Sequence, residues 1–308
     1  MNRESPYFKQ VQLLIRVLPL IAEESCFALK GGTAINLFYR DMPRLSVDID
    51  LHYVPMDNRE KALQTIRAAL SRISDRIKKA IAGVTVQNAH EQSDALRLMV
   101  AQDQVRIKIE LSPVIRGSVF PEKSMEVSKA VQEIFGYAEI DVASFPDLYA
   151  GKICAALDRQ HPRDLFDIKF LYDNEGLIPE LRKTFLVYLI SHHRPIAEVL
   201  DPPRKDISGI YESEFVRMAQ VDVSIKELEA VRERLIADIN TGITEEEKQF
   251  LLSFKGRSPQ WNLLGIDGVQ NLPSVRWKML NLEKMSAEKH REAFKKLEQV
   301  LLQDKNKT

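Results

Sequence analysis

The sequence has few of the residues that characterise several specialised classes of protein. Two cysteines, Cys26 and Cys154, occur in 308 residues, too few for a disulfide scaffold or a metal site of four thiolates. The 12 glycines and 14 prolines exclude collagen and low-complexity segments. We therefore expect a globular protein of a reducing compartment, which agrees with 44% hydrophobic and 29% charged residues.

Long hydrophobic runs are also lacking. The most apolar stretch, residues 11–22, contains Gln12, Arg16 and Pro19 and is too short to span a bilayer. The first ten residues lack the pattern of a signal peptide. These observations predict a soluble, cytoplasmic protein with no membrane partner.

An excess of charge of either sign is absent, because 44 Lys and Arg balance 44 Asp and Glu. A protein that coats nucleic acid non-specifically carries net positive charge. Any nucleic-acid partner must therefore bind a local basic patch. The stripe of Arg72, Arg76 and Lys79 is one candidate, although such a stripe is usually a solvated helix face.

Hydrophobic periodicity changes near residues 143–146. Before this point the pattern predicts strands over 26–29, 46–53, 84–88, 96–101 and 105–111, and helices over 7–24, 33–39 and 58–81. After it, helices are predicted over 146–159, 163–173, 180–192, 225–240, 245–254 and 287–302, with a proline-bearing connection at 195–203. Residues 124–140 fit a strand or a helix. We therefore predict an α+β fold, with an α/β domain at 1–143 and a mostly α-helical domain at 144–308.

Two aspartates lie two residues apart on the strand predicted at 46–53. Asp48 and Asp50 therefore point to one side, about 7 Å apart, while their apolar neighbours face the other. If the strand at 105–111 lies in the same sheet, Glu110 adds a third carboxylate. Three carboxylates suit two divalent cations in phosphoryl transfer. By itself, however, an Asp-x-Asp pair is usually a solvated strand face.

A glycine pair supplies a second motif. Gly31 and Gly32 separate a predicted buried strand from a predicted helix, where backbone N–H groups can approach a phosphate closely. Thr33 adds a hydroxyl donor and is a candidate N-cap. Taken alone, the glycines also fit a plain strand-to-helix turn. A phosphate-binding turn followed by an acidic strand is what a nucleotidyl-transfer site requires.

Two stretches carry a resemblance to a known family. Leu29-Lys30-Gly31-Gly32-Thr33-Ala34 and Pro43-Arg44-Leu45-Ser46-Val47-Asp48-Ile49-Asp50-Leu51 resemble the AbiEii/AbiGii toxin family of the DNA polymerase β-like nucleotidyltransferase superfamily. Residues 152–159 (KICAALDR) resemble its lysine motif, and residues 163–168 (RDLFDI) its Arg-Asp-x-x-Asp motif. Segments at 250–253, 261–263 and 272–278 are similar as well. The spacer at Arg40-Asp41 departs from the tighter one expected.

The resemblance implies a polymerase-β-like domain with a mixed sheet, followed by a helical domain that completes the cleft for nucleotide and acceptor. It implies catalytic roles for Asp48, Asp50, Glu110, Lys152 and Asp164, the first three also as metal ligands. The expected nucleotide-binding residues are Lys30, Gly31, Gly32, Thr33, Arg44, Ser46, Lys152 and Asp167. The residues themselves also allow a solvated Lys152 and a helix-dipole role for Asp164. Mg²⁺, or Mn²⁺ in its place, is the implied cofactor, and a nucleoside triphosphate is the co-substrate.

The implied activity is that of a toxin in a type IV-like toxin–antitoxin or abortive-infection system that defends against phage. The enzyme would transfer a nucleoside monophosphate to an acceptor and thereby block translation. The 3′ end of tRNA is the expected acceptor, and a cognate antitoxin is the expected partner. Two alternatives remain: a nucleotidyltransferase that modifies a small molecule such as an antibiotic, and a non-catalytic nucleotide-binding module.

Overall fold

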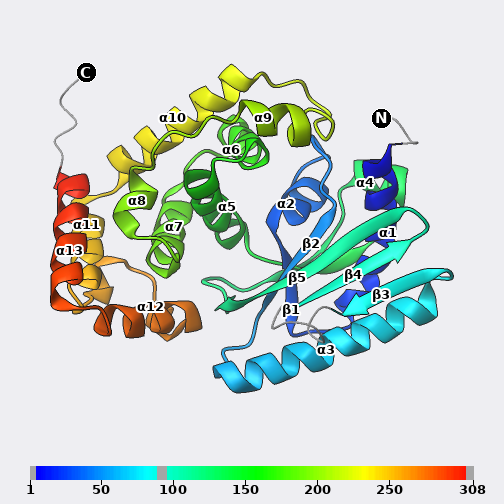
Figure 1. The fold of residues 1–308 in the computed structure, drawn as a ribbon, viewed down its shortest axis with the longest axis horizontal. Coiled ribbons are helices and arrows are strands. Elements are labelled where there is room, and N and C mark those ends of the chain that lie inside the picture. Colours follow the sequence, from blue (N-terminus) through cyan, green and yellow to red (C-terminus); the bar gives the residue numbers. More distant parts are fainter. Residues whose placement is uncertain (1–4, 89–95, 303–308) are drawn as a thin grey trace. The chain divides into compact units, whose positions relative to one another are not determined.

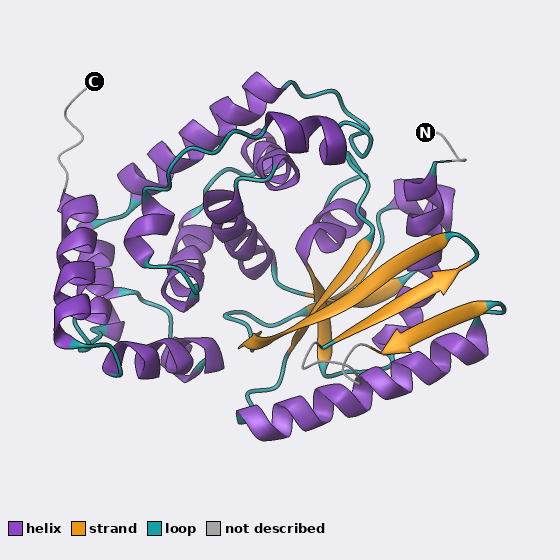
Figure 2. Cartoon of the chain, viewed as in Figure 1, coloured by secondary structure: helices purple, strands orange, loops and turns teal. Residues whose placement is uncertain are grey.

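The computed structural model describes residues 5–88 and 96–302. Within these ranges the chain forms two compact units. The first comprises residues 1–144 and 216–222, and the second comprises residues 145–215 and 223–308. Every strand of the described chain belongs to the first unit, whereas the second is helical (Figure 2).

The first unit is a mixed sheet with flanking helices (Figure 1). Its strands are β1 (Phe27–Lys30), β2 (Asp48–Tyr53), β3 (Val84–Asn88), β4 (Arg97–Gln102), β5 (Val105–Arg116), β6 (Lys123–Glu126) and β7 (Glu139–Val142). Its helices are α1 (Pro6–Ala22), α2 (Gly31–Ala34), the π-helical turn η1 (Ile35–Tyr39), α3 (Arg59–Ala80) and α4 (Lys129–Phe135). The strand order is β3-β4-β5-β2-β1-β7-β6. The β2–β5 and β1–β7 pairs are parallel and the others antiparallel.

Alternation along the strands separates an apolar face of the sheet from a charged face. Leu98, Ile109 and Ile49 occupy paired positions on β4, β5 and β2, and each is completely buried. Helix α1 packs against β5 and β7, and α3 packs against β3 and β4. Each buried aliphatic side chain contributes about 1.5–3 kcal/mol. Because this face forms the core, the intervening residues of β2, Asp48 and Asp50, lie on the opposite face.

The second unit is built from packed helices. They are α5 (Phe145–Arg159), α6 (Pro162–Asn174), α7 (Pro179–Ser191), α8 (Ile196–Leu200), α9 (Ser208–Ile210), η3 (Tyr211–Phe215), α10 (Ile225–Gly242), α11 (Glu245–Lys255), η4 (Trp261–Leu263), η5 (Val269–Asn271), α12 (Pro273–Glu283) and α13 (Ala287–Leu302). Helix α5 packs against α6 and α7, and α6 packs against α10. Capping boxes at Ser224 and Thr244 begin α10 and α11. None of the described helices is long and apolar enough to cross a membrane.

The predicted α+β fold is confirmed, but several elements differ from the sequence prediction. Residues 124–140, which fitted a strand or a helix, contain β6, α4 and the start of β7. The connection at 195–203 contains helix α8, because Pro195 is its N-cap and Pro202 lies beyond its end. Helix α2 begins at Gly31, so Thr33 lies inside it rather than at its N-cap.

Candidate active site

The charged face of the sheet carries the three predicted acids on neighbouring strands. In the parallel β2–β5 pair, Asp50 lies opposite Glu110 and Asp48 lies opposite Lys108. On the other side of β2, Lys30 of β1 lies opposite Asp50. Adjacent strands are about 5 Å apart, and paired residues share a face. The fold therefore brings Asp48, Asp50 and Glu110 to one side of the sheet, next to two lysines.

The pKa values of the two lysines are shifted in opposite directions. Lys108 Nζ is 2.6 Å from Glu110 Oε2. Burial alone would lower the pKa of Lys108, but the bond to Glu110 and the charges of Asp48 and Asp50 outweigh it and raise the pKa. Burial dominates at Lys30 and lowers its pKa, although Asp50 and Glu110 act in the opposite direction. Lys108 is not among the site residues predicted from the sequence.

The glycine turn lies directly beside the acids. Gly31 has a φ of +75°, and a Cβ at this position would collide with Oδ2 of Asp50. A Cβ on Gly32 would be 2.6 Å from Nη2 of Arg44 and 3.1 Å from Oγ of Ser46. Residue 31 therefore requires glycine because of its φ and of Asp50, whereas a side chain at residue 32 would displace the end of the Arg44 side chain.

Thr33 connects the turn to the acidic strand. Its buried hydroxyl donates to the backbone carbonyl of Asp48 and lies 3.0 Å from Oγ of Ser46. These contacts hold the start of β2 against α2. Arg44 is buried as well, and its Nη1 donates to the carbonyl of Leu45 at 3.1 Å. The Arg44 guanidinium therefore lies beside the glycine turn.

A distant segment of the chain fixes the backbone around Arg44. Residues 216–222, here called the strap, belong to the first unit although they follow η3 in sequence. Arg44 and Ala219 form an antiparallel bridge. Hydrogen bonds of 2.8 Å run from Leu45 N–H to the Met218 carbonyl and from Gln220 N–H to the Pro43 carbonyl. The strap therefore orients the segment that carries Arg44 and Ser46.

In the second unit, the predicted residues form a buried ion cluster. Lys152 Nζ lies 2.8 Å from Asp164 Oδ1 and 2.9 Å from Asp167 Oδ2. Arg159 also binds Asp164. Burial would raise the pKa of Asp164, but the charges and hydrogen bonds of Lys152 and Arg159 hold it well below its usual range. Asp164 thus fixes two cations, and α5 and α6 are tied together at this point.

Another set of potential metal ligands lies elsewhere in the second unit. Asp158, His192 and His193 each place one ligand atom within 4.8 Å of the others, the one such group found over residues 5–88 and 96–302. Burial and His193 lower the pKa of His192 to about 4. Arg194, however, already binds Asp158 at 2.8 Å, and Lys278 donates to the His192 carbonyl. This group offers one carboxylate, which Arg194 already binds, whereas Mg²⁺ prefers oxygen ligands. The three acids of the sheet offer carboxylate oxygens alone, although these are more widely spaced than the ligand atoms of Asp158, His192 and His193.

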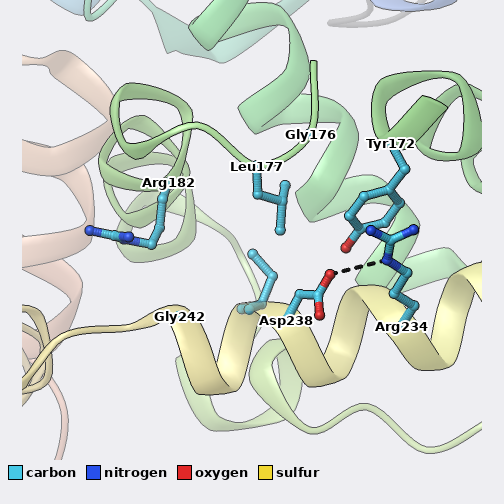
Figure 3. A pocket seen from close by; sticks show the side chains of 8 residues that line it. Tyr172, Gly176, Leu177, Arg182, Arg234, Asp238 and Gly242 are labelled. Atoms are coloured by element: carbon cyan, nitrogen blue, oxygen red, sulfur yellow. Dashed lines mark hydrogen bonds and ion pairs between the residues drawn. The ribbon is translucent and has the colours of Figure 1, made fainter. Parts of the chain in front are cut away.

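A pocket of about 280 Å³ lies between α6, α7 and α10 (Figure 3). It is lined by Tyr172, Gly176, Leu177, Arg182, Arg234, Asp238, Ile239 and Gly242. The Arg234 guanidinium stacks 3.9 Å from the Tyr172 ring centroid, and its Nε lies 3.4 Å from Asp238. Arg234 thus already contacts Tyr172 and Asp238. None of the site residues predicted from the sequence lines this pocket.

A family model described as nucleotidyl transferase AbiEii toxin, type IV TA system, matches residues 12–281. Among solved structures, the chain is similar to MenT4, a nucleotidyltransferase toxin from Mycobacterium tuberculosis H37Rv, with a TM-score of 0.60 and 14% identity. The match covers 91% of this chain and 95% of that one, and at this identity it supports the fold. No curated protein matches.

Proposed function

Since this chain belongs to the nucleotidyl transferase AbiEii toxin family and is thus a nucleotidyltransferase, we propose that it transfers a nucleoside monophosphate to the 3′ end of tRNA. The observation that carries the transfer chemistry of this proposal is the position of Asp48, Asp50 and Glu110 on one sheet face beside the Gly31 turn. Blocking the tRNA 3′ end stops translation, which accounts for toxicity. A tRNA acceptor also implies action in the cytoplasm.

The three acids fit a divalent cation. Carboxylate oxygens are the ligands that Mg²⁺ and Mn²⁺ prefer, and these three belong to adjacent strands. We assign Asp48, Asp50 and Glu110 as the residues that would hold the metal. When bound, a divalent cation neutralises charge on the triphosphate and lowers the pKa of an attacking hydroxyl.

The residues around the turn are proposed to bind the triphosphate. These are Lys30, Gly31, Gly32, Thr33, Arg44 and Ser46. The N–H groups of the turn and the buried guanidinium of Arg44 supply donors and positive charge for phosphate oxygens. The hydroxyl of Thr33 already donates to the backbone carbonyl of Asp48 and holds the strand, so the backbone N–H of Thr33 is the group proposed to bind phosphate.

The proposed reaction is a displacement at the α-phosphorus. The acceptor hydroxyl oxygen forms a bond to that phosphorus, the bond to the β-phosphate oxygen breaks, and pyrophosphate leaves. Glu110 helps to accept the hydroxyl proton. Lys152 is proposed to stabilise charge on the pyrophosphate, with Asp164 and Asp167 holding the lysine. In this scheme residues 1–143 carry the transfer chemistry, and residues 144–308 supply the remaining nucleotide and acceptor contacts.

The acceptor is tested by incubating the protein with each of the four α-labelled nucleoside triphosphates, Mg²⁺ and a tRNA pool. A parallel reaction contains aminoglycosides in place of tRNA. Label at tRNA 3′ ends is expected, and Asp48→Asn should remove it. Label on the aminoglycosides alone would favour the small-molecule alternative. Growth inhibition that survives Asp48→Asn, with no transfer by either protein, would favour the non-catalytic module.

A cognate antitoxin is the expected protein partner, because the matching family is of the type IV toxin–antitoxin class. Expression of the chain alone should therefore inhibit growth. Co-expression of the antitoxin, which we expect to be encoded next to this chain, should relieve the inhibition. Growth inhibition that persists when the adjacent gene is co-expressed would argue against this partner.

A further inference from the structure

Lys108 has no part in the proposed transfer, yet it lies in the middle of the acidic face. Its register partner across β2–β5 is Asp48. Its Nζ is 2.6 Å from Oε2 of Glu110, two residues along its own strand. The Lys108 side chain is 31% exposed, so solvent ions can reach the ammonium. The lysine thus contacts one candidate metal ligand and lies opposite another.

An ammonium and a divalent cation compete for the same carboxylate oxygens. Glu110, whose Oε2 binds Lys108, is one of the three proposed metal ligands. A positive charge about 5 Å from a divalent cation weakens its binding roughly tenfold, even with water-like screening. A lysine at position 108 should therefore lower the affinity of the site for a divalent cation by a measurable factor.

We propose that Lys108 is a built-in counter-ion that competes with the divalent cation for Asp48 and Glu110, so that the free protein holds the metal weakly. This inference rests on the proposed metal site and adds a residue that sets its affinity. Lys108 acts through the carboxylates and is a positioning residue. It also stabilises the three acids against their mutual repulsion when they lie on one face.

Arg106 provides a matched control on the same strand. It lies two residues before Lys108, on the same face by alternation, and is exposed. Its register partner is Ala101 of β4, and the β2–β5 pairing begins only at Lys108. Replacing either residue with methionine removes one positive charge, but only the Lys108 change removes it from the acids.

The test is a titration of the nucleotide-free protein with Mn²⁺ alone, followed by electron paramagnetic resonance of the unbound ion. Lys108→Met should bind Mn²⁺ about tenfold more tightly than the wild type. Lys108→Gln should tighten binding similarly, which keeps the test available if the methionine variant folds poorly. Lys108→Arg should stay close to the wild type. Arg106→Met should tighten binding by about threefold at most, because its charge lies farther from the acids.

Unchanged or weaker binding by both neutral Lys108 variants would overturn the proposal. Equal tightening by Arg106→Met would also overturn it, since the effect would then reflect net charge alone. Asp48→Asn separates this inference from the proposed function. If Asp48→Asn binds Mn²⁺ as tightly as the wild type, the metal site itself is wrong. If it loses binding while the Lys108 variants match the wild type, only the counter-ion role fails.

Discussion

Gly31 and Gly83 have nearly the same positive φ, +75° and +72°, but different surroundings. A Cβ on Gly31 would strike Asp50, whereas one on Gly83 would meet nothing within 4 Å. Alanine at either position should cost about 1–2 kcal/mol of stability because of the left-handed conformation. Gly31→Ala should in addition slow nucleotidyl transfer roughly 100-fold, since Asp50 must move.

Thermal unfolding and the rate of transfer, measured on both variants, check this difference. Gly83→Ala is the control for backbone strain. Equal transfer rates for the two variants would contradict the placement of Asp50 beside the turn.

Asp164 gives a pH-dependent prediction, because its pKa in the folded protein is well below its unfolded value. The stability it contributes is therefore complete above the unfolded pKa of about 3.9 and is lost as the pH falls below that value. Asp164→Asn should cost about 3–5 kcal/mol at pH 7, since Lys152 and Arg159 lose their shared carboxylate. The difference from the wild type should shrink below about pH 4.

Urea unfolding followed by tryptophan fluorescence measures this effect in the appropriate unit. Both tryptophans, Trp261 and Trp277, belong to the second unit, as Asp164 does. A difference in unfolding free energy that is the same at pH 7 and pH 3 would show that Asp164 is not the source of the effect.

Individual residues of the site could be read from the sequence where a local pattern carried the information. Alternation placed Asp48, Asp50 and Glu110 on strand faces, and the glycine pair marked a turn. The approach of Gly31 to Asp50 and the position of Lys108 opposite Asp48 depend on strand register, which is a long-range property. No local pattern distinguishes Lys108 from the exposed Arg106 on the same strand.

At the scale of elements, the strap gives a prediction that depends on one backbone group. Gln220 donates its N–H to the Pro43 carbonyl, next to Arg44. Gln220→Pro removes this donor and should cost about 1 kcal/mol of stability. Because Arg44 and Ser46 then lose a support, we expect the KM for nucleoside triphosphate to rise about tenfold, roughly 1.4 kcal/mol, with a smaller change in kcat.

Gln220→Ala is the matched control, because it keeps the N–H and removes the side chain. It should have the KM of the wild type. The role of the strap would be contradicted if the alanine and proline variants had the same KM, or if the proline variant lost only kcat.

Most elements were predictable because their signals are local. The strand at 84–88 and the helix at 287–302 have the predicted bounds, since alternation and helical periodicity define them directly. The parallel pairing of β2 with β5 was not predictable, because an intervening helix and hairpin separate the two strands. The sequence predicts a connection rather than helix α8, because the helix has five residues and prolines lie on both sides of it.

At the scale of the whole molecule, the sequence placed a boundary where strand-like alternation ends, at residues 143–144. The two compact units meet in sequence at Ser144 and Phe145, but the first unit also includes the strap. The strap is short and has no alternating pattern, so its sequence does not indicate that it belongs to the first unit. Its pairing with Arg44 in the structure shows this. Zero net charge likewise describes the whole chain and could not show that five charged groups, Lys30, Asp48, Asp50, Lys108 and Glu110, share one sheet face.

The central claim is that the acidic face of the sheet supports metal-dependent cleavage between the α- and β-phosphates of a nucleoside triphosphate. The most direct test follows an α-label and a γ-label in parallel reactions with tRNA, with Mg²⁺ or with EDTA. We predict that the α-label joins the tRNA while the γ-label is recovered as pyrophosphate. EDTA should abolish both outcomes, and Asp48→Asn should reduce both at least about 100-fold. Release of the γ-label as orthophosphate, its transfer to the acceptor, or full activity of Asp48→Asn would contradict the account.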